Sequence, residues 1–304
     1  MLVGFDPHYQ LRDLYYPHVG QENHTEGGPC RFGVWASLPE EMRDRNERRR
    51  QRLYWSNEGW QIDCRYRADT LATDVTMTHP TLKLELRCCD VVDFHRPVLV
   101  RRIEVVDHSG AGREVHLFHH NDFRMYGTKV GDTAYFDPQI RSMVHYRTQR
   151  YIMTTWHADG DQRIDEYASG TAGFRGAEGT WRDAEDGTLG NNAIAQGAVD
   201  STIKLNVHVP ANGSRVAYLI IACGKSYSDL EEIHRFLHRN EPQAIIDRTI
   251  AYWRLWLEAS QGQFADEREH GPGEAIDDLF KRSLLIMRTQ IDNNGAIIAA
   301  NDTD

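Results

Sequence analysis

The sequence lacks any hydrophobic run long enough to cross a membrane as a helix. Its longest uninterrupted apolar stretch, residues 217–223, is far shorter than the roughly 20 residues that a membrane-spanning helix needs. The first ten residues contain neither a basic nor an apolar segment, so no secretory signal is visible. We therefore expect a cytoplasmic protein that has no membrane partner.

Cysteine is scarce, since the 304 residues include only five. Their odd number and their spacing fit no disulfide framework and no zinc-binding pattern, so reduced thiols are expected. The adjacent pair Cys88 and Cys89 would point to opposite faces of a strand. We expect no metal and no other cofactor.

An excess of positive charge is also missing. Lys and Arg number 35 against 45 Asp and Glu, which gives a formal net charge of −10. Nucleic acid is not an expected partner, because its recognition requires a basic field. Residues 43–52 are a local exception with six arginines, but Asp44 and Glu47 dilute them and no aromatic residue is interleaved. A solvated hairpin or loop is predicted there.

Aromatic and β-branched residues are plentiful, and they alternate with polar ones up to about residue 225. Residues 81–90 place Leu82, Leu84 and Leu86 on one face, which is typical of a half-buried strand. Segments 98–107 and 113–124 are two more such runs, and the turn-forming residues between them predict a hairpin.

Further strands are predicted at 144–158, 202–209 and 215–223. Many strands joined by short turns predict a large antiparallel sandwich. Residues 159–196 are rich in Gly, Asp, Asn and Glu, so exposed loops with at most one short strand are expected there.

The periodicity becomes helical after residue 225. A capping box from Ser228 to Glu231 predicts a helix that ends near residue 239. Pro242 suits the first turn of a second helix, which ends near residue 261. A third helix after residue 273 is predicted to end at residue 293, with an apolar stripe formed by Ile276, Phe280, Leu284, Met287 and Ile291.

That stripe must be covered, either by the strand-rich part or by further helices. The predicted organisation is a β sandwich at residues 1–225, a helical linker at 226–272 and a last helical segment at 273–304.

Two segments carry a family resemblance. Residues 4–23 (GFDPHYQLRDLYYPHVGQEN), continued by 30–35 (CRFGVW), resemble the N-terminal domain of bacterial and archaeal glucoamylase-type enzymes, glycoside hydrolase family 15. Residues 282–300 resemble the first helix and following turn of that family's (α/α)6 barrel, and residues 194–200 are similar to a strand-edge segment of the same N-terminal domain.

The resemblance implies a mainly β fold: an antiparallel β super-sandwich, linker helices and the first helix of an (α/α)6 barrel, whose remainder is a partner in cis. It also implies that the parent enzyme cleaves α-glucosidic bonds in a glucose oligosaccharide with inversion. Inversion needs two carboxyl groups roughly 6.5–9.5 Å apart. In this family both are glutamates beyond the matched residues, so no catalytic residue is assigned here and the chain alone is expected to be inactive.

The loop after residue 12 holds the candidate substrate-binding residues. Ring faces at Tyr15 and Tyr16, and paired donors and acceptors at Gln21, Glu22 and Asn23, suit a sugar. In the full enzyme this loop would shape the entrance of the barrel. The alternative is a structural turn that packs the sandwich against the barrel.

Three other groups are given structural roles. His116, His119 and His120 lie near Asp122, but alternation along a strand separates them too far for one ion, so polar packing is expected. Trp253 and Trp256 are assigned to helix-on-sheet packing. Asp302 and Asp304 are assigned to a solvated terminus.

Two other functions remain open at this stage. A stand-alone carbohydrate-binding or interaction protein would explain the missing carboxylates, and a glycoside phosphorylase would share the super-sandwich and barrel. The sequence does not separate starch-type, isomalto-type and trehalose substrates, and it leaves the oligomeric state open.

Overall fold

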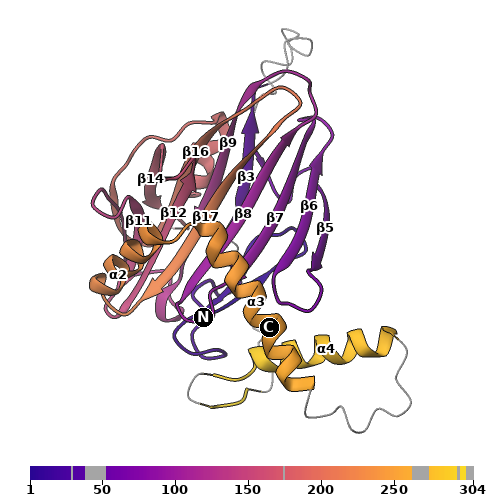
Figure 1. Cartoon of the computed structure of the whole chain (residues 1–304). Coiled ribbons are helices and arrows are strands. Elements are labelled where there is room, and N and C mark those ends of the chain that lie inside the picture. Colours follow the sequence, from indigo (N-terminus) through magenta and orange to yellow (C-terminus); the bar gives the residue numbers. More distant parts are fainter. Residues whose placement is uncertain (29, 38–52, 174, 262–273, 293–294, 299–304) are drawn as a thin grey trace.

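The computed structural model describes residues 1–28, 30–37, 53–173, 175–261, 274–292 and 295–298. Two large antiparallel sheets stack against each other, and three long helices follow them in the chain (Figure 1). The arginine-rich segment 43–52 and the terminal Asp302 and Asp304, for which the sequence made predictions, lie outside the described residues.

The larger sheet has ten strands, and β13 (Asp161–Arg163) pairs beside β12 off the main path. Its other strands, in sheet order, are β15 (Ile194–Gly197), β10 (Asp132–Asp137), β11 (Ser142–Arg147), β12 (Arg150–Ala158), β17 (Ser214–Gly224), β8 (Val98–Asp107), β7 (Leu84–Val92), β6 (Thr73–His79) and β5 (Gln61–Tyr66).

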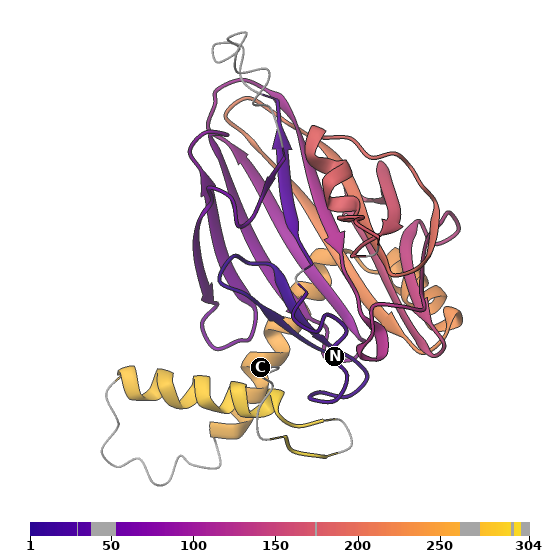
Figure 2. The same cartoon turned by 180° about the vertical axis from the view of Figure 1, so that it is seen from behind.

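The smaller sheet has five strands, and it lies behind the larger one in Figure 1 and in front of it in Figure 2. In sheet order they are β14 (Glu166–Thr171), β16 (Val199–Val209), β9 (Arg113–Asn121), β3 (Phe32–Ala36) and β4 (Tyr54–Trp55). A separate two-stranded sheet pairs β1 (Leu2–Phe5) with β2 (Leu11–Tyr15). The predicted mainly β, antiparallel sandwich is confirmed.

The main core fills the space between the two sheets. Period-two alternation sends Leu82, Leu84, Leu86 and Cys88 into it, each at most 3% exposed. Cys89 faces the opposite side and joins a second core under the helices. The predicted opposite orientation of Cys88 and Cys89 is therefore confirmed, and all five cysteines are free.

The predicted hairpin between residues 98–107 and 113–124 is wrong. β8 belongs to the larger sheet, where it pairs with β7 and β17, whereas β9 belongs to the smaller sheet, where it pairs with β3 and β16. The intervening residues therefore cross from one sheet to the other. Turn residues make the chain reverse, but they do not decide which sheet receives the next strand.

Two other segments differ from their predictions. The run at 144–158 is two strands, β11 and β12, separated at Thr148, whose φ of 47° makes a tight turn without the usual Gly or Asn. Residues 159–196 contain the strands β13 and β14, the start of β15, a short helix α1 (Thr180–Asp183) and a 3₁₀ turn η4 (Ala184–Asp186). Cross-strand pairing supplies order there that local composition does not reveal.

The helices α2 (Tyr227–Arg239) and α3 (Pro242–Gln261) cover the outer face of the larger sheet (Figure 1). The buried residues Leu230, Ile246 and Ile250 pack there on strand residues. The cap of α2 differs from the prediction: Ser226, not Ser228, accepts a hydrogen bond from the Asp229 N–H at 3.3 Å.

The last helix, α4 (Glu274–Thr289), lies below the sandwich beside the end of α3 (Figures 1 and 2). It ends four residues before the predicted stop at residue 293. Leu285 is its one buried hydrophobic residue among those described. Ile276, Leu279, Ile286 and Met287 are each 50–66% exposed. The helix therefore carries an apolar face that the described chain does not cover.

Candidate functional site

The N-terminal loop, residues 16–22, leaves the end of β2 and returns at Asn23. The Asn23 amide donates to Asp13 Oδ1 at 2.7 Å, and its oxygen accepts the N–H groups of Leu14 and Thr25, each at 3.1 Å. Asn23 is 8% exposed and Tyr15 is 3% exposed. These two candidate residues thus form the buried base of the loop.

An ion pair fixes the tip of the loop. The two carboxylate oxygens of Glu22 each accept a hydrogen bond from Arg150 at 2.6 Å, and these bonds lower the pKa of Glu22. The Arg150 guanidinium also lies 5.2 Å from the ring centroid of Tyr126. Gln21, next to this pair, is exposed to solvent. Of the five candidate residues, Gln21 is the one whose side chain is most open to a ligand.

Tyr16 connects the loop to a large cavity. Its side chain is 9% exposed, and burial raises the pKa of its hydroxyl to about 12. Its carbonyl oxygen lies 2.6 Å from the Nε2 atom of His24. Tyr16 therefore lines this cavity, while its carbonyl oxygen is held by His24.

The same loop contacts the segment that follows α4. His18 Nδ1 lies 2.9 Å from Asp292 Oδ2. Gly20 approaches Ile298 so closely that a Cβ atom at this position would lie 2.8 Å from the Ile298 side chain, and its φ of +78° also favours glycine. The two sequence segments that carry the family resemblance, far apart in the chain, thus touch in the structure.

The cavity has a volume of about 570 Å³, within the range of small-molecule sites. Its walls come from β1, the N-terminal loop, the ends of β5 and β7, α3 and the end of α4. Trp253 and Tyr252 line it from α3. The ring of Trp253 contacts those of Tyr252 and Trp256 on the same helix, so its predicted packing on the sheet stays a prediction.

The floor of the cavity holds a buried charged network around Asp90, which is 2% exposed. Arg101 Nε donates to one Asp90 oxygen at 2.6 Å, and Thr73 donates to the other at 2.7 Å. Tyr9 also donates to that second oxygen. Burial raises the pKa of Tyr9 well above its ordinary value. These bonds occupy the Asp90 carboxylate, so it is a fixed counter-ion and not a free acid or base.

The histidines of β9 serve packing contacts. The ring of His116 stacks on Trp35 with centroids 4.5 Å apart, and His120 Nε2 lies 2.9 Å from Asp200 Oδ2. His119 is buried, and burial lowers its pKa well below the ordinary value. Among the residues described, no group of three or more His, Cys, Asp or Glu is placed to hold a metal ion.

Sequence reasoning missed the participation of Arg150 and Asp292. Neither stands in a recognisable motif, because each meets the loop from a distant part of the chain. The ion pair of Arg150 with Glu22 joins residues 128 positions apart, and the contact of His18 with Asp292 joins residues 274 positions apart.

Comparison with solved structures places this geometry in a known fold. The chain resembles a bacterial glucoamylase solved in complex with acarbose, with a TM-score of 0.71 and 12% sequence identity. This is a glucoamylase-like fold. The match covers 97% of this chain but 40% of the glucoamylase, which combines a super-sandwich with an (α/α)6 barrel.

Other comparisons give weaker or no matches. A protein assigned as a kojibiose phosphorylase from the human microbiome has a TM-score of 0.45 and 8% identity, over 80% of this chain and 30% of that one. No protein-family model and no curated protein matches the sequence. None of the described helices is long and apolar enough to span a membrane.

Proposed function

We propose that this chain is the N-terminal scaffold of a glucoamylase-like, inverting glycoside hydrolase that acts on α-glucosidic bonds. The match to two fifths of a glucoamylase, over nearly all of this chain, is the observation that carries the proposal. In this proposal residues 1–225 form the super-sandwich domain, 226–272 the linker and 273–304 the start of the barrel.

The uncovered apolar face of α4 supports the same proposal. Four large apolar side chains on one face of this 16-residue helix expose more surface than a solvated helix face normally does. In an (α/α)6 barrel such a face packs on neighbouring helices. The rest of the barrel, in cis, is therefore the proposed partner of this face.

The proposal assigns no hydrolytic activity to the chain alone. Inversion requires a general acid of raised pKa facing a second carboxylate across the sugar. Burial raises the pKa of Asp132 to about 6, but that carboxyl is 1% exposed and lies close to Arg147. The carboxylates of Asp90 and Asp93 on the cavity wall are bonded to Arg101 and Arg248. None of these three is free to protonate a glycosidic oxygen.

The N-terminal loop would then border the entrance of the barrel, because it already touches the segment after α4. Within it we assign different roles to the five candidate residues. Tyr15 and Asn23 hold the base, Glu22 fixes the tip through Arg150, and Gln21 and the edge of Tyr16 are the groups that would meet an oligosaccharide.

A direct test compares this chain with the polypeptide encoded by the uninterrupted reading frame that contains it. Both are incubated with maltooligosaccharides, and proton NMR records the anomer of released glucose. We expect β-glucose from the longer protein and none from residues 1–304. Release of glucose by the chain alone would contradict the assignment.

The alternatives give different outcomes in the same experiment. A reading frame that stops after Asp304, together with oligosaccharide binding, would favour a stand-alone binding protein. Turnover that requires phosphate would identify a phosphorylase.

The loop assignment is tested in the longer hydrolase. Gln21→Ala is expected to raise KM several-fold with normal folding, whereas Asn23→Ala should lower stability by about 1–3 kcal/mol, because it leaves buried N–H groups without an acceptor. Glu26→Ala, at an exposed position of the same segment, is the matched control. Unchanged kinetics in Gln21→Ala would leave the loop with only its packing role.

A further inference from the structure

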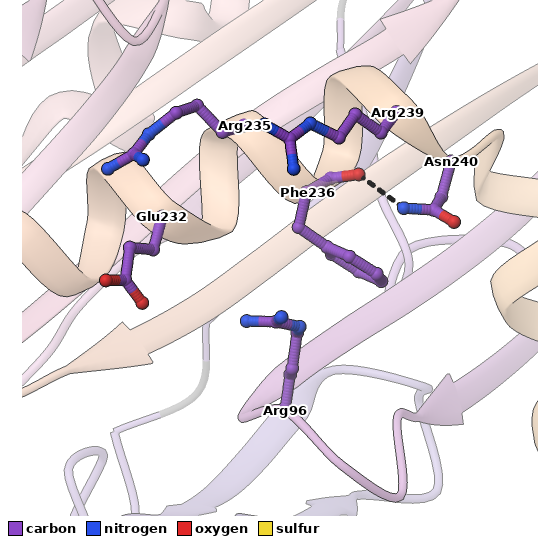
Figure 3. A pocket seen from close by; sticks show the side chains of 6 residues that line it. All are labelled: Arg96, Glu232, Arg235, Phe236, Arg239 and Asn240. Carbon is purple, nitrogen blue, oxygen red and sulfur yellow. Dashed lines mark hydrogen bonds between the residues drawn. The ribbon is translucent and has the colours of Figure 1, made fainter.

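A second, smaller cavity lies where the turn between β7 and β8 meets α2. Its volume is about 280 Å³, close to the lower end of small-molecule sites, about 300 Å³. Figure 3 shows Arg96 extending from the turn towards Phe236, with Arg235 and Arg239 projecting from α2. The six lining residues are Arg96, Glu232, Arg235, Phe236, Arg239 and Asn240.

The turn that carries Arg96 is held in place by Asp93. One Asp93 oxygen accepts the N–H groups of His95 and Arg96, each at 2.9 Å. The other oxygen pairs with Arg248 of α3. The Asp93 side chain is fully buried, so the backbone position of Arg96 is fixed from beneath.

The Arg96 side chain is also oriented. Its guanidinium carbon lies 4.6 Å from the ring centroid of Phe236, and Arg248 lies 5.0 Å from the same centroid. Stacking of this kind uses the flat face of a guanidinium and leaves its in-plane N–H groups available. Within the described parts of the chain, no carboxylate lies within ion-pairing distance of Arg96.

The opposite wall adds two positive charges. Arg235 and Arg239 stand one helical turn apart, an arrangement of like charges that destabilises a helix. Positive residues do favour the end of a helix, and Arg235 Nε donates to the Glu231 carbonyl of the same helix at 3.2 Å, whereas the Phe236 carbonyl is taken by the Asn240 amide at 2.8 Å. Arg96 belongs to a different element, so the helix end does not explain its presence.

The charge balance of this cavity is opposite to that of the whole protein. Three guanidinium groups line it together with one carboxylate, Glu232, and about half a negative charge from the end of α2. The cavity is therefore positive in a chain whose net charge is −10. A doubly charged ligand gains more here than a singly charged one, because the interaction scales with charge.

We propose that this cavity binds a phosphate group, presented either as free phosphate or as a phosphorylated sugar. The in-plane N–H groups of Arg96 match the geometry of phosphate oxygens, and Arg239 and Arg235 supply the remaining positive charge. The space beyond one phosphate leaves room for a sugar beside the edge of Phe236. This site goes beyond the proposed hydrolase function and is independent of it, since it needs only residues 93–97 and α2.

The test titrates the 304-residue chain with inorganic phosphate, a hexose 6-phosphate and the uncharged hexose, by calorimetry at low ionic strength. We expect saturable binding of both phosphate compounds at one site and none of the hexose. Tighter binding of the hexose phosphate would identify the sugar ester as the source of the group, and equal binding would identify free phosphate. Absence of binding by both phosphate compounds would overturn the proposal.

Variants locate the site. Arg239→Gln, at an exposed position, should weaken binding about tenfold without affecting folding, as expected for loss of one charge-assisted contact. Arg96→Lys keeps the charge but loses the planar fork, and it should also weaken binding. Arg215→Gln removes an equal charge from an exposed position at the other end of the larger sheet and should leave affinity unchanged. Equal weakening in Arg215→Gln and Arg239→Gln would show a non-specific charge effect and refute the site.

Discussion

The sandwich and α4 differ in how completely each covers its own surface. The sandwich buries even charged groups and supplies their partners, as with Arg101 on Asp90 at 2.6 Å and Arg113 on Asp107 at 2.6 Å. The helix α4 is held by Leu285 and by polar contacts at its side, such as Arg282 to the Thr70 carbonyl at 3.0 Å. Its side chains of Ile276, Leu279, Ile286 and Met287 face solvent.

The two regions therefore differ in what already lies against them. Burial of a charge is tolerated where an oppositely charged partner lies beside it, as for Arg101 and Arg113 in the sandwich. The apolar face of α4 gains stability only when something covers it. Three sets of variants test this difference.

The largest effect is expected in the buried network of the sandwich. Arg101→Met leaves the Asp90 carboxylate buried without its counter-ion, which should lower the free energy of unfolding by about 3–5 kcal/mol. Urea denaturation measures this value. Arg102→Met is the matched control, because its ion pair with Glu104 is partly exposed and should contribute at most about 1 kcal/mol.

A double variant separates loss of the ion pair from loss of packing. Arg101→Met combined with Asp90→Asn removes the unpaired charge and should recover part of the lost stability. If the double variant were as unstable as the sum of both single variants, the buried charge would not be the cause.

The second effect is a loss of sandwich stability in acid. Burial lowers the pKa of His145 to about 3, so this side chain stays neutral in the fold while the unfolded chain takes up a proton below about pH 6.5. The contribution of His145 to the free energy of unfolding is therefore fully present above pH 6.5. It falls by about 1.4 kcal/mol per pH unit as the pH drops from 6.5 towards 3. Urea unfolding at pH 7, 6 and 5 measures the slope.

The variant His145→Asn should reduce this slope by about the same amount, and His8→Asn at an exposed position should not. α4 contains no histidine, so this acid effect should reach it only through unfolding of the sandwich. An unchanged slope in His145→Asn would mean that other groups control acid stability.

The smallest effect on stability, but the clearest on association, is expected at α4. The uncovered face should bind an apolar dye and cause self-association of the isolated chain. Met287→Glu or Ile286→Glu should reduce both while changing stability by about 0.5 kcal/mol or less. Ile194→Glu, which replaces an exposed apolar residue on β15, is the control and should leave dye binding unchanged. A monomer without dye response would show that the face needs no cover.

The candidate site shows where sequence reasoning reaches its limit. The pattern predicted the loop and its five candidate residues, because side chains of types that suit a sugar cluster within nine consecutive positions. It did not reveal that Asn23 has its amide in the base of the loop, or that Arg150 holds Glu22. Those roles depend on which distant residues come near, and an arginine in a strand carries no local sign of its partner.

Local patterns in the sequence were enough to predict a strand-rich part followed by three helices. Alternation of period two is local, so the inward-facing side chains of Leu82, Leu84, Leu86 and Cys88 could be identified without a structure. Contacts between distant residues place β8 and β9 in different sheets and bring the N-terminal loop to the residues after α4, and the fold makes Ser226 the cap of α2. A strand buries the same face whether it pairs with its predecessor in a hairpin or joins the opposite sheet. The two arrangements differ in hydrogen-bond partners and not in the alternation of side chains.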